Sequence, residues 1–185
     1  MTPDRAPVSL LSHPIRIEAI RPRGTKVVVQ AAAEQLPGIA ALLGLVSLEM
    51  LEARYDLTRN GERVKLEGRI AARFHQACIV TLDPFPVQLD VPVQLDFTPE
   101  AEAAAFAKRN ERDDAKIDIE VMLNEEDPPE PIIDGVIELG NITLEFLALA
   151  LDPYPRKPGA SFESSSGDTG TESPFAALAK LKRGD

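Results

Sequence analysis

Two runs of alternating apolar and polar residues around Asn60-Gly61 limit what this chain can fold into more than any other feature. The run before the turn is VSLEMLEARYDLTR, and the run after it is RVKLEGRIAARF. A period of two is typical of a strand with one buried face. Because asparagine and glycine accept positive φ, the pattern predicts a β-hairpin. Its candidate core residues are Leu48, Met50, Tyr55, Val64, Leu66, Ile70 and Ala72.

Further strands are expected on both sides of this hairpin. Residues 14–20 (PIRIEAI) alternate, and residues 26–30 (KVVVQ) form a short β-branched run. Residues 75–82 (HQACIVTL) predict another strand, and VQLDVPVQLDF alternates strictly through residue 97. Pro92 within that last run cannot donate to a ladder, so we expect it at an edge or a bulge.

Two helices complete the predicted domain. AAAEQLPGIAALLGL favours a short helix with Pro37 in its first turn, where the missing N–H costs little. Residues 139–151 (LGNITLEFLALAL) predict a longer helix that packs deeply on the sheet and ends at Asp152-Pro153. Its expected buried face is Leu139, Ile142, Phe146, Leu149 and Ala150, widened by Leu144, Leu147 and Leu151.

The remaining segments are polar. Residues 100–134 hold twelve Asp and Glu against four Lys and Arg, which predicts an acidic insertion or long loop, ordered only in part. Residues 1–12 are expected to be a flexible N-terminus, and residues 160–172 a Ser/Thr/Gly-rich linker. Residues 173–185 predict a short amphipathic motif. The predicted domain is therefore residues 13–159, an α+β fold: an antiparallel twisted sheet or partly open β-barrel covered by one long and one short helix, with a flexible C-terminal tail.

Charge and composition reduce the number of partner classes that fit this chain. The formal charge of −10 opposes binding to nucleic acid through phosphates alone, and steers the chain toward basic partners. The sequence has no apolar run of membrane-spanning length and no secretory signal at its start, so no membrane partner is expected. The lone Cys78 cannot form an internal disulfide and suits the cytoplasm.

No enzyme motif is present in the sequence: there is no G-x-S-x-G, P-loop, G-x-G-x-x-G or HExxH. Cys78 and His75 lie three positions apart on the predicted strand, which places them on opposite faces. We expect Cys78 to be a buried core residue and His75 a surface residue. The sequence therefore predicts no catalytic residue, no metal ligand and no cofactor.

Three motifs carry a family resemblance. HQACIVTLDPFP resembles a Q-x-C-V-V-T-L-E-P block, ELG…LALALDPYPRKPGA resembles D-L-G…L-A-L-A-L-D-P-Y-P-R-K-P-G-A, and SPFAALAKLK is similar to N-P-F-A-x-L-x-x-L-K. Their order and spacing agree over residues 14–182. The chain is identified on these motifs as a member of the alphaproteobacterial branch of the DUF177 (YceD-like) family.

The resemblance implies a non-enzymatic ribosome biogenesis factor. Members are associated with accumulation of 23S ribosomal RNA, and plastid relatives with rRNA processing. The implied partner is precursor rRNA of the large subunit or a basic ribosomal protein, and not DNA. Many members carry C-x-x-C in the central block and further cysteines after the last helix, a pattern that resembles a metal site. Here Thr81 replaces the second cysteine and DPYPRKPGA contains none, so that site is expected to be lost.

Two groups of residues are candidate partner contacts. The first group follows the predicted helix at residues 139–151: Asp152, Tyr154, Arg156 and Lys157. It either serves only to end that helix or forms a rigid, partly basic ledge that a partner recognises. The second either folds back on the domain or docks on a partner: Phe175, Leu178, Leu181 and Lys182. The acidic segment either keeps the chain soluble or imitates RNA phosphate toward a basic ribosomal protein.

Two other classes of function stay open at this point. A small-molecule-binding β-barrel requires a large apolar cavity inside the sheet. A thiol-dependent enzyme requires an exposed Cys78 with a depressed pKa.

Overall fold

A computed structural model describes residues 10–113 and 128–161 of the chain. In chain order the elements are β1 (Pro14–Arg16), a 3₁₀ turn (Ile17–Ala19), β2 (Thr25–Gln30), α1 (Leu36–Leu42), β3 (Ser47–Asn60), β4 (Arg63–Ala77), β5 (Pro84–Pro99), α2 (Glu100–Asp113), β6 (Glu130–Ile132), β7 (Val136–Glu138) and α3 (Leu139–Ala150).

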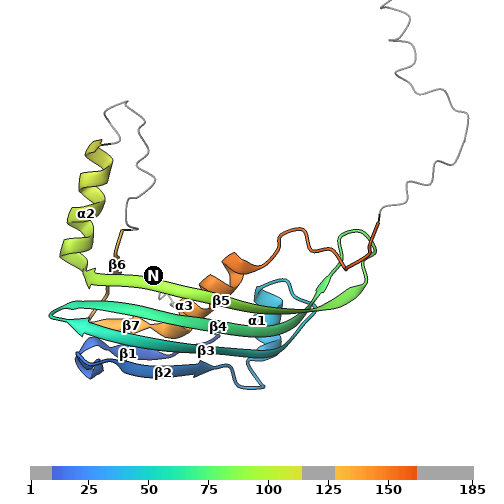
Figure 1. Ribbon diagram of the computed structural model, residues 1–185, viewed down its shortest axis with the longest axis horizontal. Coiled ribbons are helices and arrows are strands. Elements are labelled where there is room, and N and C mark those ends of the chain that lie inside the picture. The colour runs from blue at the N-terminus through green and yellow to red at the C-terminus, as the bar shows by residue number, and fades with distance from the viewer. Residues whose placement is uncertain (1–9, 114–127, 162–185) are drawn as a thin grey trace, which may run out of the picture.

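The fold is α+β, as predicted. Five strands form one sheet in the order β2-β3-β4-β5-β6, and β1 pairs with β7 in a separate two-stranded ladder. The two outer strands of the large sheet do not pair with each other, so the sheet stays open and is not a closed barrel. Its long strands are antiparallel, whereas β6 runs parallel to the end of β5. Figure 1 shows α3 and α1 on the same side of the curved sheet.

The predicted hairpin is confirmed as β3 and β4. Asn60 pairs with Arg63, so Gly61 and Glu62 form the loop and Asn60 still belongs to the strand. Gly61 has a φ of 65°, the conformation that glycine adopts without a steric penalty. The turn thus lies one residue later than the Asn60-Gly61 dipeptide suggested.

A β-bulge explains why one core prediction in β3 is wrong. The register of β3 against β4 shifts between Leu48 and Met50. Leu48 is buried before the shift and Leu51 after it, while Met50 is only half-buried. An extra residue in one strand reverses which side chains face the core, so simple alternation fails beyond it.

Two other predicted strands are corrected. Residues 14–20 extend only through Arg16, because Ile17–Ala19 turn into a 3₁₀ helix. Residues 75–82 are not a separate strand: β4 continues to Ala77, and the chain then turns from Cys78 to Leu82. The predicted place of Pro92 is confirmed, since at that position β5 pairs with β4 and no described strand pairs with its other edge.

The core lies between the concave face of the sheet and α3. Tyr55 on β3 is buried, and its hydroxyl lies 2.8 Å from Oγ1 of Thr143 on α3. Its ring also covers Gly68 on β4, where an added Cβ would lie 2.5 Å from Tyr55 Cδ1. The absence of a side chain at Gly68 therefore leaves room for the ring of Tyr55, which contacts β4 and reaches α3.

The buried face of α3 is rotated from the predicted one. Leu149 is 76% exposed, and Ile142 and Phe146 are only half-buried. The residues that face the core are Leu139, Gly140, Thr143, Leu144 and Leu147. Gly140 permits contact with the chain at Leu11, whose carbonyl oxygen lies 1.9 Å from an ideal Cβ on Gly140. The orientation of α3 is therefore decided by the close backbone packing at Gly140 and by the hydrogen-bonded hydroxyl of Thr143. The most apolar stripe of the helix does not decide it.

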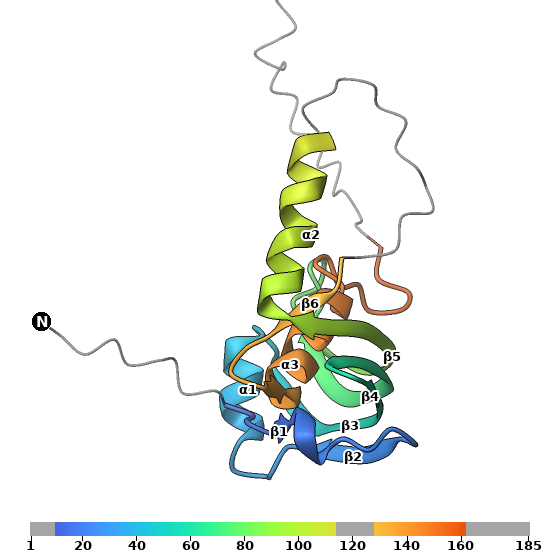
Figure 2. The same ribbon diagram turned by 90° about the vertical axis from the view of Figure 1, so that its left-hand side faces the viewer.

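Two described parts of the acidic segment have regular secondary structure. Its first residues form α2, and residues 130–132 form β6 beside β5. In Figure 2, α2 projects away from the end of the sheet. Residues 114–127 lie outside the described part of the chain, as do residues 1–9 and 162–185. The proposed boundaries of the flexible N-terminus, linker and C-terminal motif stay predictions.

Candidate functional site

The residues that follow α3 pack against the turn that follows β4. The amide of Ile79 donates to the carbonyl of Pro155 at 3.0 Å, and Gln76 Nε2 donates to the carbonyl of Asp152 at 3.4 Å. Lys157 Nζ lies 3.5 Å from Asp83 Oδ2. We name residues 152–157 together with the turn at 78–83 the ledge. Its two segments are far apart in sequence and are held together by both backbone and side-chain bonds.

The structure brings the first predicted group of contact residues together on this ledge. Asp152, Tyr154, Arg156 and Lys157 are all exposed. Asp152 Oδ1 accepts a 2.8 Å hydrogen bond from the amide of Tyr154, which holds the start of the segment in shape. The second predicted group, Phe175, Leu178, Leu181 and Lys182, lies outside the described residues.

Sequence reasoning predicted the exposed Tyr154 but missed the other exposed apolar side chains in the ledge and on the last turn of α3. Leu82 is 77% exposed, and its φ of 62° is unusual for a residue other than glycine. Ile79 is exposed on the same turn, and Leu149 and Tyr154 are exposed on the last turn of α3 and just after it. Large exposed apolar side chains next to basic ones are typical of a protein interaction site. No sequence signal separated these leucines from core residues.

Cys78 lies in the ledge and not on a core strand, which corrects the sequence prediction. It is buried, as expected, but lies just beyond the end of β4. Backbone N–H groups of Lys157 and then Thr81 donate to its sulfur and lower the pKa of the thiol to about 7, against the opposing effect of burial. A buried thiol lacks the exposure that a nucleophile requires.

The donor set of the ledge does not fit a structural zinc ion. Such a site takes four cysteine or histidine ligands, and the ledge offers the single thiol of Cys78. Within the described ranges, no group of three or more His, Cys, Asp or Glu residues could hold a metal ion.

His75 belongs to a different cluster on the outer face of the sheet. Its Nδ1 lies 2.9 Å from Glu49 Oε1 and 3.2 Å from Ser47 Oγ. Ser47 Oγ also donates to Glu49, and this bond, followed by those from His75, lowers the pKa of the Glu49 carboxyl. A catalytic triad uses the two ring nitrogens for different partners, so this arrangement does not activate Ser47.

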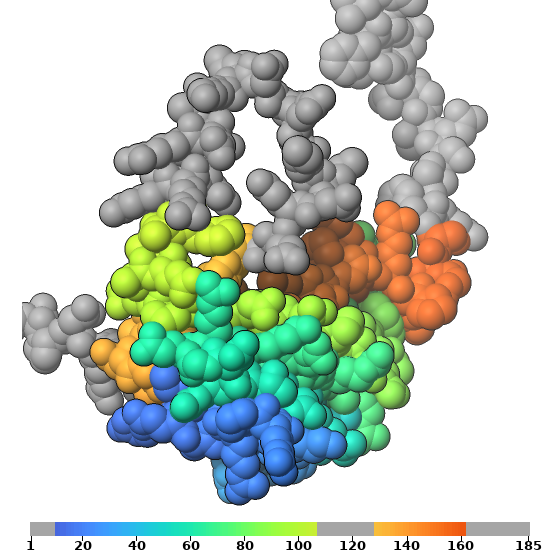
Figure 3. Space-filling model, turned by 60° about the vertical axis from the view of Figure 1, so that its left-hand side comes forward, coloured from blue at the N-terminus to red at the C-terminus, as the bar shows by residue number. Residues whose placement is uncertain are grey.

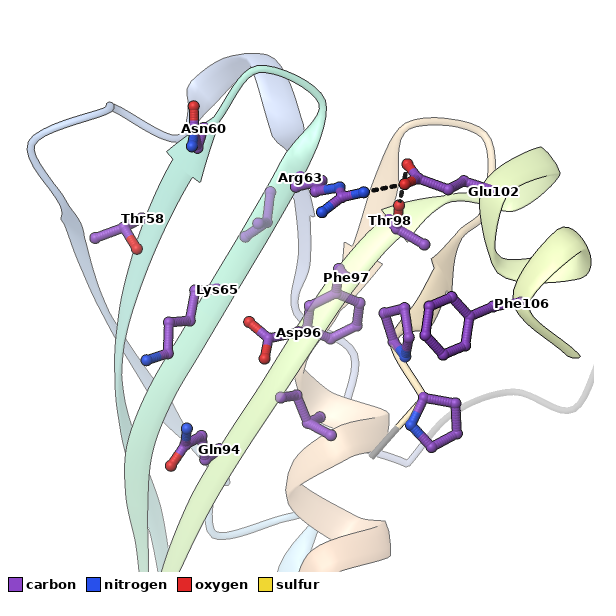
Figure 4. A pocket seen from close by; sticks show the side chains of 14 residues that line it. Thr58, Asn60, Arg63, Lys65, Gln94, Asp96, Phe97, Thr98, Glu102 and Phe106 are labelled. Carbon is purple, nitrogen blue, oxygen red and sulfur yellow. Dashed lines mark hydrogen bonds and ion pairs between the residues drawn. The ribbon is translucent and has the colours of Figure 1, made fainter. Parts of the chain in front are cut away.

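A cleft of about 840 Å³ lies at the opposite end of the sheet, at the base of α2. Figures 1 and 3 show α2 and residues 151–161 toward opposite ends of the molecule, and Figure 4 shows the cleft closely. We name it the α2 cleft; its lining is Thr58, Asn60, Arg63, Val64, Lys65, Gln94, Leu95, Asp96, Phe97, Thr98, Glu102, Phe106, Pro128 and Pro129. It opens beside α2, outside the core between the sheet and α3, and is not the enclosed apolar cavity of a ligand-binding barrel.

A hydrogen-bonded clamp fixes the wall of this cleft. Glu102 on α2 accepts bonds from Arg63 on β4 and, at 2.7 Å, from the hydroxyl of Thr98 at the end of β5 (Figure 4). The bond from Arg63, followed by that from Thr98, lowers the pKa of the Glu102 carboxyl. The first turn of α2 is thereby tied to both strands.

Comparison with known families identifies the chain. The sequence profile described as Large ribosomal RNA subunit accumulation protein YceD matches residues 66–182, more than half of the chain. The chain belongs to the YceD family. The YceD match includes most of β4, the whole ledge, β5 and α2, so both candidate surfaces lie largely within the shared region.

The YceD description ties the family to accumulation of large-subunit ribosomal RNA and names no catalytic activity. No curated protein and no solved structure matches this YceD chain. Within the described ranges, no helix has both the length and the apolar character needed to cross a membrane.

Proposed function

We propose that this protein is a non-enzymatic ribosome biogenesis factor, which promotes accumulation or processing of 23S rRNA by binding. The observation that carries the proposal is the YceD family match over residues 66–182. Its partner is large-subunit precursor rRNA or a basic ribosomal protein. We also propose a cytoplasmic location, which a ribosome-related role supports.

The ledge is the partner contact that we propose. Its backbone is held in place because Ile79 in the turn and Gln76 at the end of β4 donate hydrogen bonds to the carbonyls of Pro155 and Asp152, so little order has to be gained on binding. It presents an exposed tyrosine beside an arginine and a lysine, side chains that suit recognition of either RNA or protein. The C-terminal residues Phe175, Leu178, Leu181 and Lys182 are proposed to add a second contact.

The alternative functions have less support. A small-molecule barrel needs an apolar interior cavity, whereas the α2 cleft lies outside the core and has a polar floor. A thiol-dependent enzyme needs an exposed sulfur, and Cys78 is buried.

Crosslinking in living cells tests this proposal. The full chain carries an affinity tag, and the captured RNA is sequenced while captured proteins are identified by mass spectrometry. A ledge variant combines Tyr154→Ala, Arg156→Ala and Lys157→Ala. A matched control combines Val28→Ala, Lys26→Ala and Arg54→Ala on the exposed outer face of the sheet.

We expect the native chain to enrich large-subunit rRNA or ribosomal proteins, the control to match it, and the ledge variant to enrich them at least fivefold less. If neither rRNA nor any ribosomal protein is enriched by the native chain, the proposed function is wrong. If the ledge variant and the control behave alike, the ledge is not the contact.

A further inference from the structure

The two long edges of the large sheet differ in the hydrogen-bond donors that they offer. On β5, Pro86 and Pro92 have no N–H, and β6 pairs with the end of that strand. The opposite edge is β2, a β-branched strand without proline. No described strand pairs with the outer side of β2, and Figure 1 shows it as the outermost strand, next to β3. Prolines block a sheet edge, so β2 is the edge that is more open to a further strand.

The register of β2 against β3 shows which backbone groups point outward. In an antiparallel ladder every second pair exchanges N–H···O=C bonds, and the residues between these pairs turn their amides and carbonyls to the other side. The amide of Ala31, just after β2, donates to the carbonyl of Leu51 at 3.1 Å, its counterpart when the register is continued by one residue. Counting back by two along β2, the groups that point away from β3 belong to Lys26, Val28 and Gln30.

The side chains at these three positions lie on the exposed face of the sheet. Val28 is 53% exposed, with the polar side chains of Lys26 and Gln30 on either side of it. The next residue, Val29, points to the opposite face and is buried in the core. The β2 edge therefore joins outward-pointing backbone groups to an exposed β-branched side chain, a combination that favours the addition of another strand.

The order of the side chains suits pairing with a second copy of the same strand. In a symmetric antiparallel pair centred on Val28, this residue meets Val28 of the second copy, and Lys26 meets Gln30. The three residue pairs use every outward-pointing group of both strands, with two hydrogen bonds for each pair. Two β-branched side chains then pack at the centre, and no like charges lie opposite each other. A pair centred on Lys26 would instead place two ammonium groups opposite each other.

We propose that β2 pairs with β2 of a second copy of this chain, in an antiparallel register centred on Val28, so that the two large sheets join into one across a twofold axis. The contact is a single strand of six residues, much smaller than the interface of a permanent dimer. The dimer is therefore weak and depends on protein concentration. This inference goes beyond the proposed function, and it involves neither the ledge nor the α2 cleft.

Substitutions at residue 28 test both the contact and its register. Because this residue meets its own counterpart, Val28→Lys places two cations opposite each other and Val28→Glu two anions, whereas a mixture of the two variants pairs a cation with an anion. The matched controls are Val46→Lys and Val46→Glu, since Val46 is 55% exposed and lies outside β2. Sedimentation velocity of the full chain over a dilution series measures self-association. In the mixtures, one variant carries a fluorescent label.

We expect the native chain and both Val46 variants to form a dimer, with dissociation constants equal within about twofold. Val28→Lys alone and Val28→Glu alone are expected to associate about fivefold more weakly or less, and their mixture to recover the native association. Circular dichroism and Tm are expected to stay unchanged, because both valines are exposed.

Four outcomes would each overturn the inference. They are a native chain that stays monomeric at every concentration, a Val28→Lys chain that associates like the native one, a Val46→Lys chain that loses as much association as Val28→Lys, and a mixture that associates no better than either Val28 variant alone. The first outcome would leave the β2 edge to a partner other than a second copy.

The outcome is separate from that of the crosslinking test. The alanine control of that test keeps the outward-pointing backbone groups of β2 and an intact ledge, so its expected behaviour is unchanged. If the native chain captures ribosomal components in cells but does not dimerise, this inference fails and the proposed function stands. If it dimerises through β2 but captures no ribosomal component, the proposed function fails and this inference stands.

Discussion

At the scale of single residues, buried polar groups join the sheet to its main helix. Thr143 donates to the carbonyl of Leu139 at 2.7 Å, so its oxygen accepts the proton of the Tyr55 hydroxyl 2.8 Å away. Burial raises the pKa of Tyr55, which keeps that hydroxyl protonated. Removing only the acceptor leaves a buried donor without a hydrogen bond, and this lowers stability more than replacing both partners with apolar groups.

Thr143→Val is therefore predicted to destabilise the fold by about 1–3 kcal/mol, because the Tyr55 hydroxyl is left buried without an acceptor. Tyr55→Phe is predicted to cost less, about 0.5–1.5 kcal/mol, since Thr143 keeps its bond to Leu139. Urea unfolding of both single variants and the double variant measures the coupling. A double variant whose loss equals the sum of the single losses contradicts this role.

The thiol of Cys78 provides a second residue-scale prediction. Its absorbance at a thiolate wavelength is expected to titrate with a midpoint of about 7 in the native protein and closer to 9 in urea. Because the folded pKa is the lower one, the thiolate contribution to stability grows as pH rises from about 7 and is lost as pH falls below it. The Cys78→Ser variant, which has no thiol, gives the background absorbance for this titration. A native midpoint above 8.5 would argue against the amide contacts that we assign.

At the scale of elements, the sequence pattern predicted the helices and strands that depend on nearby residues, and failed where residues distant in the sequence decide the structure. The hairpin and α3 were predictable because their apolar periodicity is continuous. The burial of Met50 was not, since the bulge depends on pairing with β4. The turn after Ala77 looked like a strand in the sequence because it is rich in β-branched residues, yet its amides bond to distant residues such as Pro155. The helix α2 is anchored by Arg63, which lies 39 positions before Glu102.

Gly140→Ala tests the close packing at the start of α3. Alanine in a helix interior normally stabilises it by about 1 kcal/mol relative to glycine. Here the new Cβ would meet the carbonyl oxygen of Leu11 at 1.9 Å, so we expect a loss of about 2 kcal/mol or more. Ala148→Gly at an exposed position of α3 is the control and should cost about 1 kcal/mol. A Gly140→Ala protein as stable as the native one would contradict the packing.

The clamp at the base of α2 predicts a pH dependence. Because the folded pKa of Glu102 is lowered, its contribution to holding α2 is present above the ordinary value of 4.5 and is lost as pH falls through the lower folded value. Nuclear magnetic resonance of the side-chain carboxyl should give a midpoint below 4.5, and Arg63→Ala should move it back toward 4.5. An Arg63→Ala midpoint equal to the native one would show that Arg63 is not the cause.

At the scale of the whole molecule, the open sheet separates two surfaces of different chemistry. The ledge at one end combines apolar and basic side chains, and the α2 cleft at the other combines apolar rings with charged side chains of both signs. The four described ledge residues could be proposed from sequence because prolines and charges cluster there. The cleft could not, since its lining comes from three strands, a helix and residues 128–129.

The most direct test of the account is the ratio of large- to small-subunit rRNA in cells that lack this protein. We predict a lowered ratio, restored by the native chain and by Cys78→Ser but not by the ledge variant. The control with Lys26→Ala, Val28→Ala and Arg54→Ala should restore it fully. A ratio unchanged by loss of the protein, or one that a folded Cys78→Ser chain does not restore, would contradict action through binding alone.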